Sequence, residues 1–308
     1  MRRGLVLILI AIAVVAMMAA TAGPPDPMPA PPPGAFAFAA MGDAPYYPWE
    51  ELRFRNTLAD LDQHDLASVI HVGDIFWRPC TDAHYRKALA RLDGLRAPVV
   101  YTPGDNEWTD CWEEGSGGFE PLERLASLRR IFFAQPVALP RFERQRVYVE
   151  NARWEQHGFV FATLHVTGSR NGLGRSPRDD AAARERLDAT ITWMRDTFAR
   201  AANARGVILA FHASTSLELP KGHERRQPYE PFIAALEEES KRYGRTVLII
   251  HGDDHQFVVD HPVAGVPNLT RLEVPGSPDV GWVRVEVTPR GASPFTFSRR
   301  VVPEWKLW

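Results

Sequence analysis

The stretch VLIIHGDDHQF, residues 247–257, decides what kind of fold and site this sequence encodes. An apolar run ends in a cluster where His251, Asp253, Asp254 and His255 stand within five positions. A buried strand that delivers acid and imidazole at its carboxyl end is typical of α/β proteins, whose ligand sites gather at those strand ends. The same arrangement recurs elsewhere in the chain.

Short apolar runs predict further strands, and helical patterns separate most of them. The expected strands are residues 35–41, 67–72, 98–102, 159–166, 206–211 and 246–250. The expected helices are residues 49–63, 81–95, 120–133, 179–203 and 229–243. This alternation of β and α predicts an α/β sheet covered by helices on its faces. After residue 255 the pattern changes to strands and turns, and we expect that tail to complete a second sheet within the same domain.

The amino-terminal segment has the layout of a secretory signal. Two arginines precede an apolar run, residues 5–20, and Ala20-Thr21-Ala22 supplies a small-residue cleavage site. We expect cleavage after Ala22 and export to the periplasm or the extracellular space. The alternative is an uncleaved anchor through residues 4–20, because a run of roughly 17 residues is at the lower limit for spanning a bilayer. Residues 23–34, rich in proline, read as a tether, and residues 35–308 as a single domain.

Composition narrows the function classes. The formal net charge of −2 gives no basic field that would hold a polyanion, so nucleic acid is not expected as a specific partner. The only two cysteines are Cys80 and Cys111. An exported chain meets an oxidising compartment, and we therefore predict a disulfide between them. The alternative is a pair of unpaired thiols.

Acids and histidines follow five of the predicted strands. Four of the acids come directly after a glycine, which permits a sharp turn or a close backbone approach. These candidate metal ligands are Asp43, Asp74, Asp105, His212, Asp253 and His255. A single Gly-Asp step is more often a helix cap or a turn, and a lone strand-end histidine is more often packing. Six such residues in one α/β chain favour a shared site.

Converging carboxylates repel one another unless cations neutralise them. Mixed aspartate and histidine ligands without thiolate fit Mn, Fe, Zn or Mg better than a structural zinc cage. A cluster this rich could hold two metal ions bridged by one carboxylate. Two such ions can clamp a phosphate ester and activate water.

The order of the motifs resembles the calcineurin-like metallophosphoesterase superfamily. The motifs are GDAP (42–45), GD (73–74), GDNE (104–107), FH (211–212) and GDDH (252–255). The resemblance implies a four-layer αββα sandwich of two mixed β-sheets flanked by helices, the metallo-dependent phosphatase fold, with a dinuclear site on its rim. It also implies a ligand set: Asp43, Asp74 and His255 for one ion, and Asp105, His212 and Asp253 for the other, with Asp74 bridging.

The sequence departs from that superfamily in three of the motifs: the first, the third and the last. Pro45 stands where the first motif of the superfamily has a histidine. The distantly similar purple acid phosphatases also lack that histidine and use a tyrosine from the second motif instead. Trp77 occupies that tyrosine's position and cannot serve, so Tyr46 is the candidate substitute, or else an aromatic wall of the pocket. In the last motif Asp253 replaces a histidine, which favours a harder cation such as Mg or Mn.

The third motif can be aligned in two frames. In the direct frame Asp105 is a ligand and Asn106 stands on the superfamily's phosphate-contacting histidine, where it can donate a hydrogen bond but not a proton. Shifting by one residue makes Asn106 the ligand and Glu107 the acid. Gly104 matches the superfamily in the direct frame, which we prefer.

Other residues could complete the site. The loop GSRNGLGR, residues 168–175, carries Arg170 and Asn171, which could contact the substrate's phosphate or belong to an ordinary mobile loop. A bridge between Cys80 and Cys111 would tie together two ligand loops, because each cysteine lies six residues beyond a predicted ligand. The same loops carry three tryptophans, Trp77, Trp108 and Trp112. They could form an apolar rim that accepts an organic ester, or they could pack in the core.

The amino-terminal signal predicts export, and the resemblance implies a phosphoesterase that hydrolyses small phosphate esters by attack of a metal-bound hydroxide. Asp74 and Asn106 are the predicted catalytic residues: Asp74 bridges the ions and Asn106 orients the phosphate. The alternatives are a catalytically degenerate module of the same fold that binds metal or phosphate, and a membrane-anchored interaction protein that retains only the fold.

Overall fold

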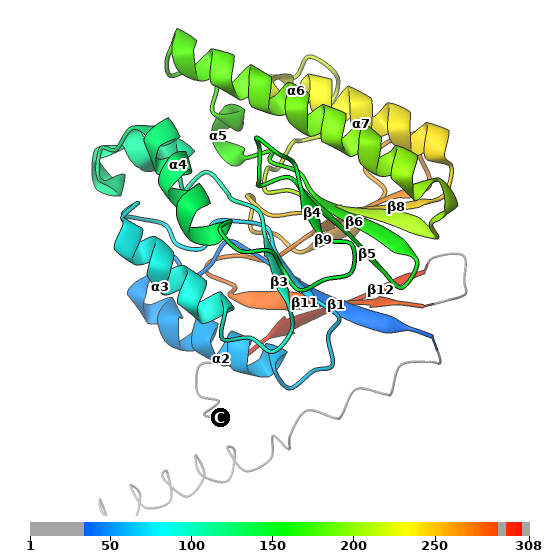
Figure 1. Cartoon of the computed structure of the whole chain (residues 1–308), viewed down its shortest axis with the longest axis horizontal. Helices are drawn as coiled ribbons and strands as arrows, with labels where there is room; N and C mark the ends of the chain where they lie inside the picture. The colour runs from blue at the N-terminus through cyan, green and yellow to red at the C-terminus, as the bar shows by residue number, and fades with distance from the viewer. Residues whose placement is uncertain (1–33, 289–293, 304–308) are drawn as a thin grey trace, which may run out of the picture. The chain divides into compact units, whose positions relative to one another are not determined.

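Two β-sheets face each other in the computed structural model, which describes residues 34–288 and 294–303 (Figure 1). Among the described residues, one sheet has five strands and the other has seven. In spatial order the first sheet contains β12 (Phe295–Val301), β11 (Gly281–Val287), β1 (Phe36–Met41), β2 (Val69–His71) and β3 (Val99–Tyr101). The second contains β4 (Glu143–Arg144), β5 (Ala152–Gln156), β6 (Phe159–Thr163), β7 (Gly206–Ala210), β8 (Thr246–His251), β10 (Leu269–Glu273) and β9 (Val258–Asp260).

Alternating side chains on the strands build two separate cores. In β1, Phe36 and Phe38 lie in the core between the sheets, whereas Ala37 and Ala39 lie in the core on the opposite face. This is the two-residue period of a strand buried on both faces. β6, β7 and β8 divide their residues in the same way, with one half in the core between the sheets and the other half against helices.

Helices cover the two outer faces. The helices are α2 (Glu51–Leu61), α3 (Asp82–Leu92), α4 (Pro121–Phe132), α5 (Gly168–Asn171), α6 (Pro177–Arg200) and α7 (Glu230–Tyr243). Short 3₁₀ turns are η1 (Pro48–Glu50), η2 (Thr109–Trp112), η3 (Glu114–Ser116), η4 (Ala201–Asn203) and η5 (Gln227–Tyr229).

The helices complete a four-layer arrangement. Apolar residues of α2 pack on the outer face of the five-stranded sheet, and those of α6 and α7 pack on the outer face of the seven-stranded sheet. α3 and α4 pack against each other beside β3 (Figure 1). The predicted αββα sandwich of two mixed sheets flanked by helices is therefore confirmed.

The carboxyl-terminal tail differs from our expectation. Instead of completing one second sheet, its strands divide between both sheets: β9 and β10 extend the sheet of β8, and β11 and β12 extend the sheet of β1. The reason is pairing between distant segments. β10 runs parallel to β8, whereas β11 runs antiparallel to β1. Each sheet thus combines strands from the αβ region with strands from the tail.

The predicted signal, residues 1–22, lies outside the described residues, as does the predicted tether except for Gly34. Both therefore stay predictions. Among the residues that are described, no helix has the length and apolar character to span a membrane.

Candidate metal centre

Each sheet delivers ligand candidates at the carboxyl ends of its parallel strands. β1, β2 and β3 are parallel neighbours, and the acids that follow them are Asp43, Asp74 and Asp105. β7 and β8 are parallel neighbours in the facing sheet, and the residues that follow them are His212, Asp253 and His255. Because the sheets pack face to face, these six residues meet at one edge of the sandwich.

His212 lies at the centre of the cluster and is fully buried. Its Nδ1 lies 2.9 Å from the carbonyl oxygen of Val72, to which the Nδ1–H donates. That contact leaves Nε2 to face the carboxylates, at 2.9 Å from Asp105 Oδ1 and 3.5 Å from both Asp74 Oδ1 and Asp253 Oδ1. A carbonyl that fixes the ring in this way is the usual support of a metal-ligating histidine.

Two overlapping sets of three side chains could each hold a cation. Within each set, one ligand atom per residue lies within 4.8 Å of the others. The sets are Asp43, Asp74 and His212, and Asp105, His212 and Asp253. The second set is the trio expected for one ion. In the first set His212 stands where His255 was expected.

His255 and Tyr46 flank the first set. His255 Nδ1 lies 2.6 Å from the carbonyl oxygen of Ser277, and its Nε2 lies 3.8 Å from Asp43 Oδ1. The Tyr46 hydroxyl donates to Asp74 Oδ2 at 2.5 Å, and its ring meets the His255 ring edge to face at 5.1 Å. Both side chains thus border Asp43 and Asp74, so either can join a cation bound there.

The backbone is held in an unusual conformation at four of these positions. The φ angles are positive at Asp43 (54°), Asp74 (53°), Asp253 (79°) and His255 (61°). Non-glycine residues rarely adopt this left-handed region, and where it persists it often marks a functional site. Here all four such residues lie within four positions of the end of their strand.

Glycines make room for the carboxylates. A Cβ at Gly104 would collide with the Asp74 carboxylate, and one at Gly252 would collide with that of Asp43. Two of the four Gly-Asp steps are thus explained by close approach, because Gly104 and Gly252 each lie against the aspartate of another motif. Gly73 instead lies against the backbone of Gly104. Alanine in place of Gly104 or Gly252 would displace the carboxylate.

Burial dominates the electrostatics of the acids. It raises the pKa of Asp43 to about 8, partly offset by His212, and it raises the pKa of Asp74 well above the usual range. For Asp105 burial acts in the same direction, but the hydrogen bond and charge of His212 outweigh it and lower the pKa to about 2. Asp43 and Asp74 therefore hold their protons to higher pH than exposed aspartates do, until a cation compensates their charge.

The residues fit a bound metal cation. Asp43 Oδ2 is buried and has no hydrogen-bond partner within the described residues. A buried polar oxygen normally has a partner, and a metal cation would provide one here. The remaining donors are carboxylate oxygens, imidazole nitrogens and a phenol. Such a set suits Mg, Mn, Fe or Zn and excludes a thiolate cage.

Asn106 and Glu107 of the third motif make hydrogen bonds that connect the loops carrying Asp74 and Asp105. The Asn106 N–H donates to Asp74 Oδ1 at 3.1 Å. Glu107 is fully buried; its carboxylate accepts the N–H of Ile75, and also the N–H of Gly104 at 2.8 Å. Glu107 thus ties the Asp74 and Asp105 loops together. The sequence pointed to Glu107 only in the alternative alignment of the third motif, as an acid of the site.

The loop after β6 places its polar residues in three different environments. Asn171 is buried, and its Oδ1 accepts a hydrogen bond from Arg186 Nη2 at 2.8 Å. Arg170 is exposed. The residue that touches the cluster is Ser169, whose Oγ lies 2.7 Å from Asp105 Oδ2. Its signal was present: Gly168-Ser169 follows a strand just as the Gly-Asp steps do.

The disulfide between Cys80 and Cys111 is present, with a Cα–Cα distance of 5.7 Å. It joins the segments that follow Asp74 and Asp105, as expected. The tryptophans divide between core and rim: Trp108 is buried in the core with α3 and α4, whereas Trp112 is 52% exposed. Trp77 packs against Tyr47 and under the guanidinium of Arg78.

The two remaining polar residues of the opening stretch point away from the cluster. His251 is fully buried, stacks on Phe211 and has its pKa lowered to about 4 by burial. Asp254 accepts hydrogen bonds from Ser214 at 2.7 Å and from Arg225 at 3.2 Å, on the surface side. Fold and site together define an α/β sandwich protein with a candidate dinuclear metal centre.

Comparisons with known proteins give structural similarity only. No protein-family model and no curated protein matches the chain. The protein TT1561 of Thermus thermophilus is 14% identical with a TM-score of 0.45, over 82% of this chain and 94% of that one. A phosphopantetheinyl hydrolase from Mycobacterium tuberculosis is 15% identical with a TM-score of 0.48, over 79% and 90% of the two chains.

A 5′-nucleotidase from Candida albicans is 12% identical with a TM-score of 0.47; the similarity covers 86% of this chain and half of the nucleotidase. With TM-scores below 0.5, these similarities carry no argument about activity.

Proposed function

We propose that this protein is an exported, metal-dependent phosphoesterase that hydrolyses small phosphate esters at a dinuclear site. The observation that carries the proposal is the convergence of Asp74, Asp105 and Asp253 around Nε2 of His212. Asp43 lies beside the Nδ1 of the same ring, whose N–H donates to the carbonyl oxygen of Val72. Cations bound there would neutralise the phosphate oxygens and lower the pKa of a water molecule. The reaction adds water across the P–O bond and releases an alcohol.

The residues of the chain divide the work between two positions. Asp43 and His255 would hold one cation, and Asp105, His212 and Asp253 the other. Asp74 would bridge them, since its carboxylate faces both Tyr46 and His212.

The half-buried Asn106 would orient the phosphate by donating from its side-chain amide, as Arg170 could from the rim. We leave Asn171 out of the substrate contacts, because its carboxamide oxygen is already bonded to Arg186.

Metal content and hydrolysis test the proposal together. The protein is loaded separately with Mn, Fe, Mg or Zn and assayed with 4-nitrophenyl phosphate, a monoester, and bis(4-nitrophenyl) phosphate, a diester. We expect about two ions per chain and hydrolysis of one ester class. Asp74→Asn should lose at least one ion and lower kcat/KM by 10²-fold or more.

Asp254→Asn is the matched control, because it removes a neighbouring carboxylate that points away from the cluster. It should retain both the ions and the activity. If Asp74→Asn behaves like Asp254→Asn, the proposed site is wrong. Bound ions without hydrolysis of either ester would instead identify the degenerate binding module.

Export is tested separately. The mature protein recovered from the periplasm or the medium should begin at residue 23, as read by amino-terminal sequencing. Recovery of the full-length chain in the membrane fraction would favour the anchor through residues 4–20.

A further inference from the structure

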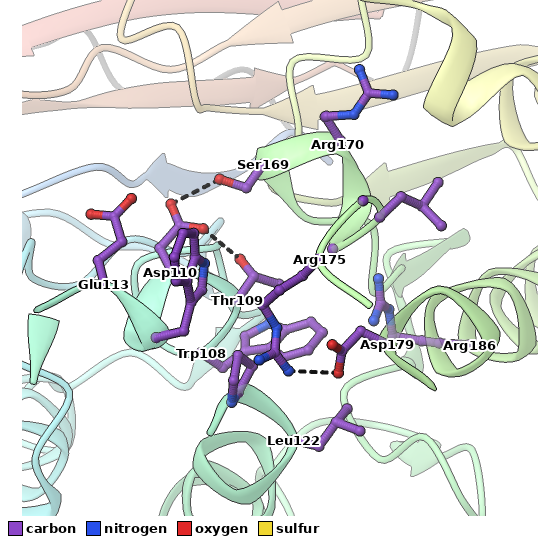
Figure 2. Close-up of a pocket in the computed structure, with 15 residues that line it drawn as sticks. Trp108, Thr109, Asp110, Glu113, Leu122, Ser169, Arg170, Arg175, Asp179 and Arg186 are labelled. Atoms are coloured by element: carbon purple, nitrogen blue, oxygen red, sulfur yellow. Dashed lines mark hydrogen bonds and ion pairs between the residues drawn. The ribbon is translucent and has the colours of Figure 1, made fainter. Parts of the chain in front are cut away.

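A pocket of about 490 Å³ lies beside the candidate metal centre (Figure 2). Its apolar wall includes Trp108, which precedes η2, Trp112 of η2, Leu122 of α4 and Leu173 of the loop after α5. The volume falls in the range of ordinary small-molecule sites. The six candidate ligands are not among its lining residues, so it is a separate space that borders the cluster.

Ser169 joins the pocket to the cluster. It lines the pocket, and its Oγ lies 2.7 Å from Asp105 Oδ2 and 2.8 Å from Asp110 Oδ2. Asp110 lines the pocket as well. A single hydroxyl therefore contacts both a candidate metal ligand and the pocket wall, which places the pocket one side chain away from the second set of ligands.

The wall that the two sites share is held rigidly. Ser169, Arg170 and Asn171 have φ angles of 46°, 57° and 57°, so α5 is a left-handed turn built from non-glycine residues. Such a turn persists only where its surroundings over-determine it. Arg186 supplies that support by donating to the carbonyl oxygen of Asn171 at 2.6 Å and to its Oδ1 at 2.8 Å.

The space between this turn and the candidate ligands is also tightly limited. A Cβ at Gly168 would lie 2.6 Å from Asp253 Oδ1 and 2.8 Å from Asp105 Oδ1. The turn therefore begins in van der Waals contact with two candidate ligands and ends in the pocket wall. Both sites are preformed in the same piece of chain.

The charges of the pocket disfavour an anionic occupant. Arg175 forms ion pairs with Asp179 at 2.6 Å and with Glu120 at 3.1 Å. Arg186 is engaged with the α5 turn and lies over the Trp108 ring. In Figure 2, Arg170 extends away from Arg175 and Trp108.

Two acids strengthen this bias. Asp110 and Glu113 contribute carboxylates to the lining, and Figure 2 shows both on the side of Ser169. A second phosphate bound on that side of the pocket would meet negative charge.

We propose that this pocket binds the leaving group of the ester, and that the leaving group is uncharged and contains a flat ring. The indole of Trp112, 52% exposed, offers a flat apolar surface for such a ring, and Leu122 and Leu173 add apolar wall beside it. This inference rests on the proposed function, because it gives the reacting phosphate to the metal centre and the organic group to the pocket.

Filling the pocket tests this assignment. Leu122→Trp and Leu173→Trp each place an indole in the space, from two different segments of the wall. Each protein is loaded with metal and assayed with 1-naphthyl phosphate and ethyl phosphate, or with their methyl diesters if diesters are hydrolysed. Both variants should lower kcat/KM for the naphthyl ester at least 10-fold more than for the ethyl ester. The matched control is Val147→Trp, at a residue that is 62% exposed and does not line the pocket.

Calorimetry provides a readout that does not depend on activity. 1-Naphthol should bind the wild type and Val147→Trp but not the two filled variants, and 1-naphthol-4-sulfonate should bind the wild type at least 10-fold more weakly. Equal losses for both esters, unchanged naphthol binding in both filled variants, or equal affinity for the sulfonate would overturn the inference. Naphthol binding that the filled variants lose, without hydrolysis of any ester, would retain the pocket and reject the phosphoesterase.

Discussion

At the scale of single residues, supporting contacts decide which atoms face the cluster. His212 and His255 each use Nδ1 against a backbone carbonyl, from Val72 and Ser277 respectively, so both turn Nε2 toward Asp43 or its neighbours. The histidines were visible in the sequence. Their carbonyl partners were not, because any residue type can supply a carbonyl and only the fold brings it within reach.

Glu107 provides a prediction at this scale. Its two carboxylate oxygens accept N–H groups from the Asp74 and Asp105 loops, and glutamine can replace only one of those acceptors. The other N–H would then face an NH₂ group in a buried site. We expect Glu107→Gln to cost about 1–3 kcal/mol of unfolding free energy and to weaken metal binding roughly 10- to 100-fold.

Thermal unfolding and metal titration of the same samples check this prediction. Glu114→Gln is the control, since Glu114 is exposed on η3. A Glu107→Gln protein with unchanged metal affinity would show that these hydrogen bonds do not position the ligands.

At the scale of elements, the sequence predicted strands best where they are apolar throughout. β1, β6, β7 and β8 all lie within their expected ranges apart from His251, the last residue of β8. β5, with the sequence ARWEQ, was missed because it carries three polar residues. One of them, Arg153, is buried nonetheless, because it pairs with Glu143 and Asp196 and stacks on Trp193. Those partners come from other elements and leave no local signal.

The same limit applies to longer-range features. The division of the tail between two sheets depends on strand pairing across most of the chain, which periodicity does not encode. The left-handed α5 turn depends on Arg186, 15 residues after Asn171. By contrast, the meeting of the candidate ligands was predictable from the sequence, because the carboxyl ends of parallel strands lie at the same edge of a sheet.

The disulfide provides the prediction for this scale. It closes a loop of 31 residues between the segments that follow Asp74 and Asp105. Removing it by Cys80→Ser with Cys111→Ser should cost about 3–4 kcal/mol on the chain-entropy account. The melting temperature should fall by roughly 10 °C, and metal affinity should fall with it. Calorimetry and metal titration measure the two effects; loss of stability without loss of affinity would show that the bridge does not organise the ligand loops.

At the scale of the whole molecule, the buried acids couple stability to pH and to metal. In the ion-free protein the pKa of Asp43 is about 8, against 3.8 for the unperturbed group, so the folded state holds the proton more tightly than the unfolded chain. Its contribution to stability is present below pH 3.8 and is lost as the pH rises to about 8. The raised pKa of His212 acts in the same direction above pH 6.5.

We therefore expect the melting temperature of chelator-treated protein to fall by several degrees between about pH 5 and pH 8. Excess Mn²⁺ should remove most of that fall, because the ligands are then ionised in the folded state. Scanning calorimetry with and without the ion measures both curves. Parallel curves in the two conditions would indicate that these acids do not bind the cation.

The most direct test of the central claim is an anomalous diffraction experiment on crystals loaded with Mn²⁺. The account predicts two anomalous peaks, one beside Asp43 and Asp74 and one beside Asp105, His212 and Asp253, each within about 2.0–2.5 Å of its ligand atoms. An oxygen of Asp74 should lie between the two peaks. Peaks located elsewhere, or none at this cluster in crystals that contain the ion, would contradict the account.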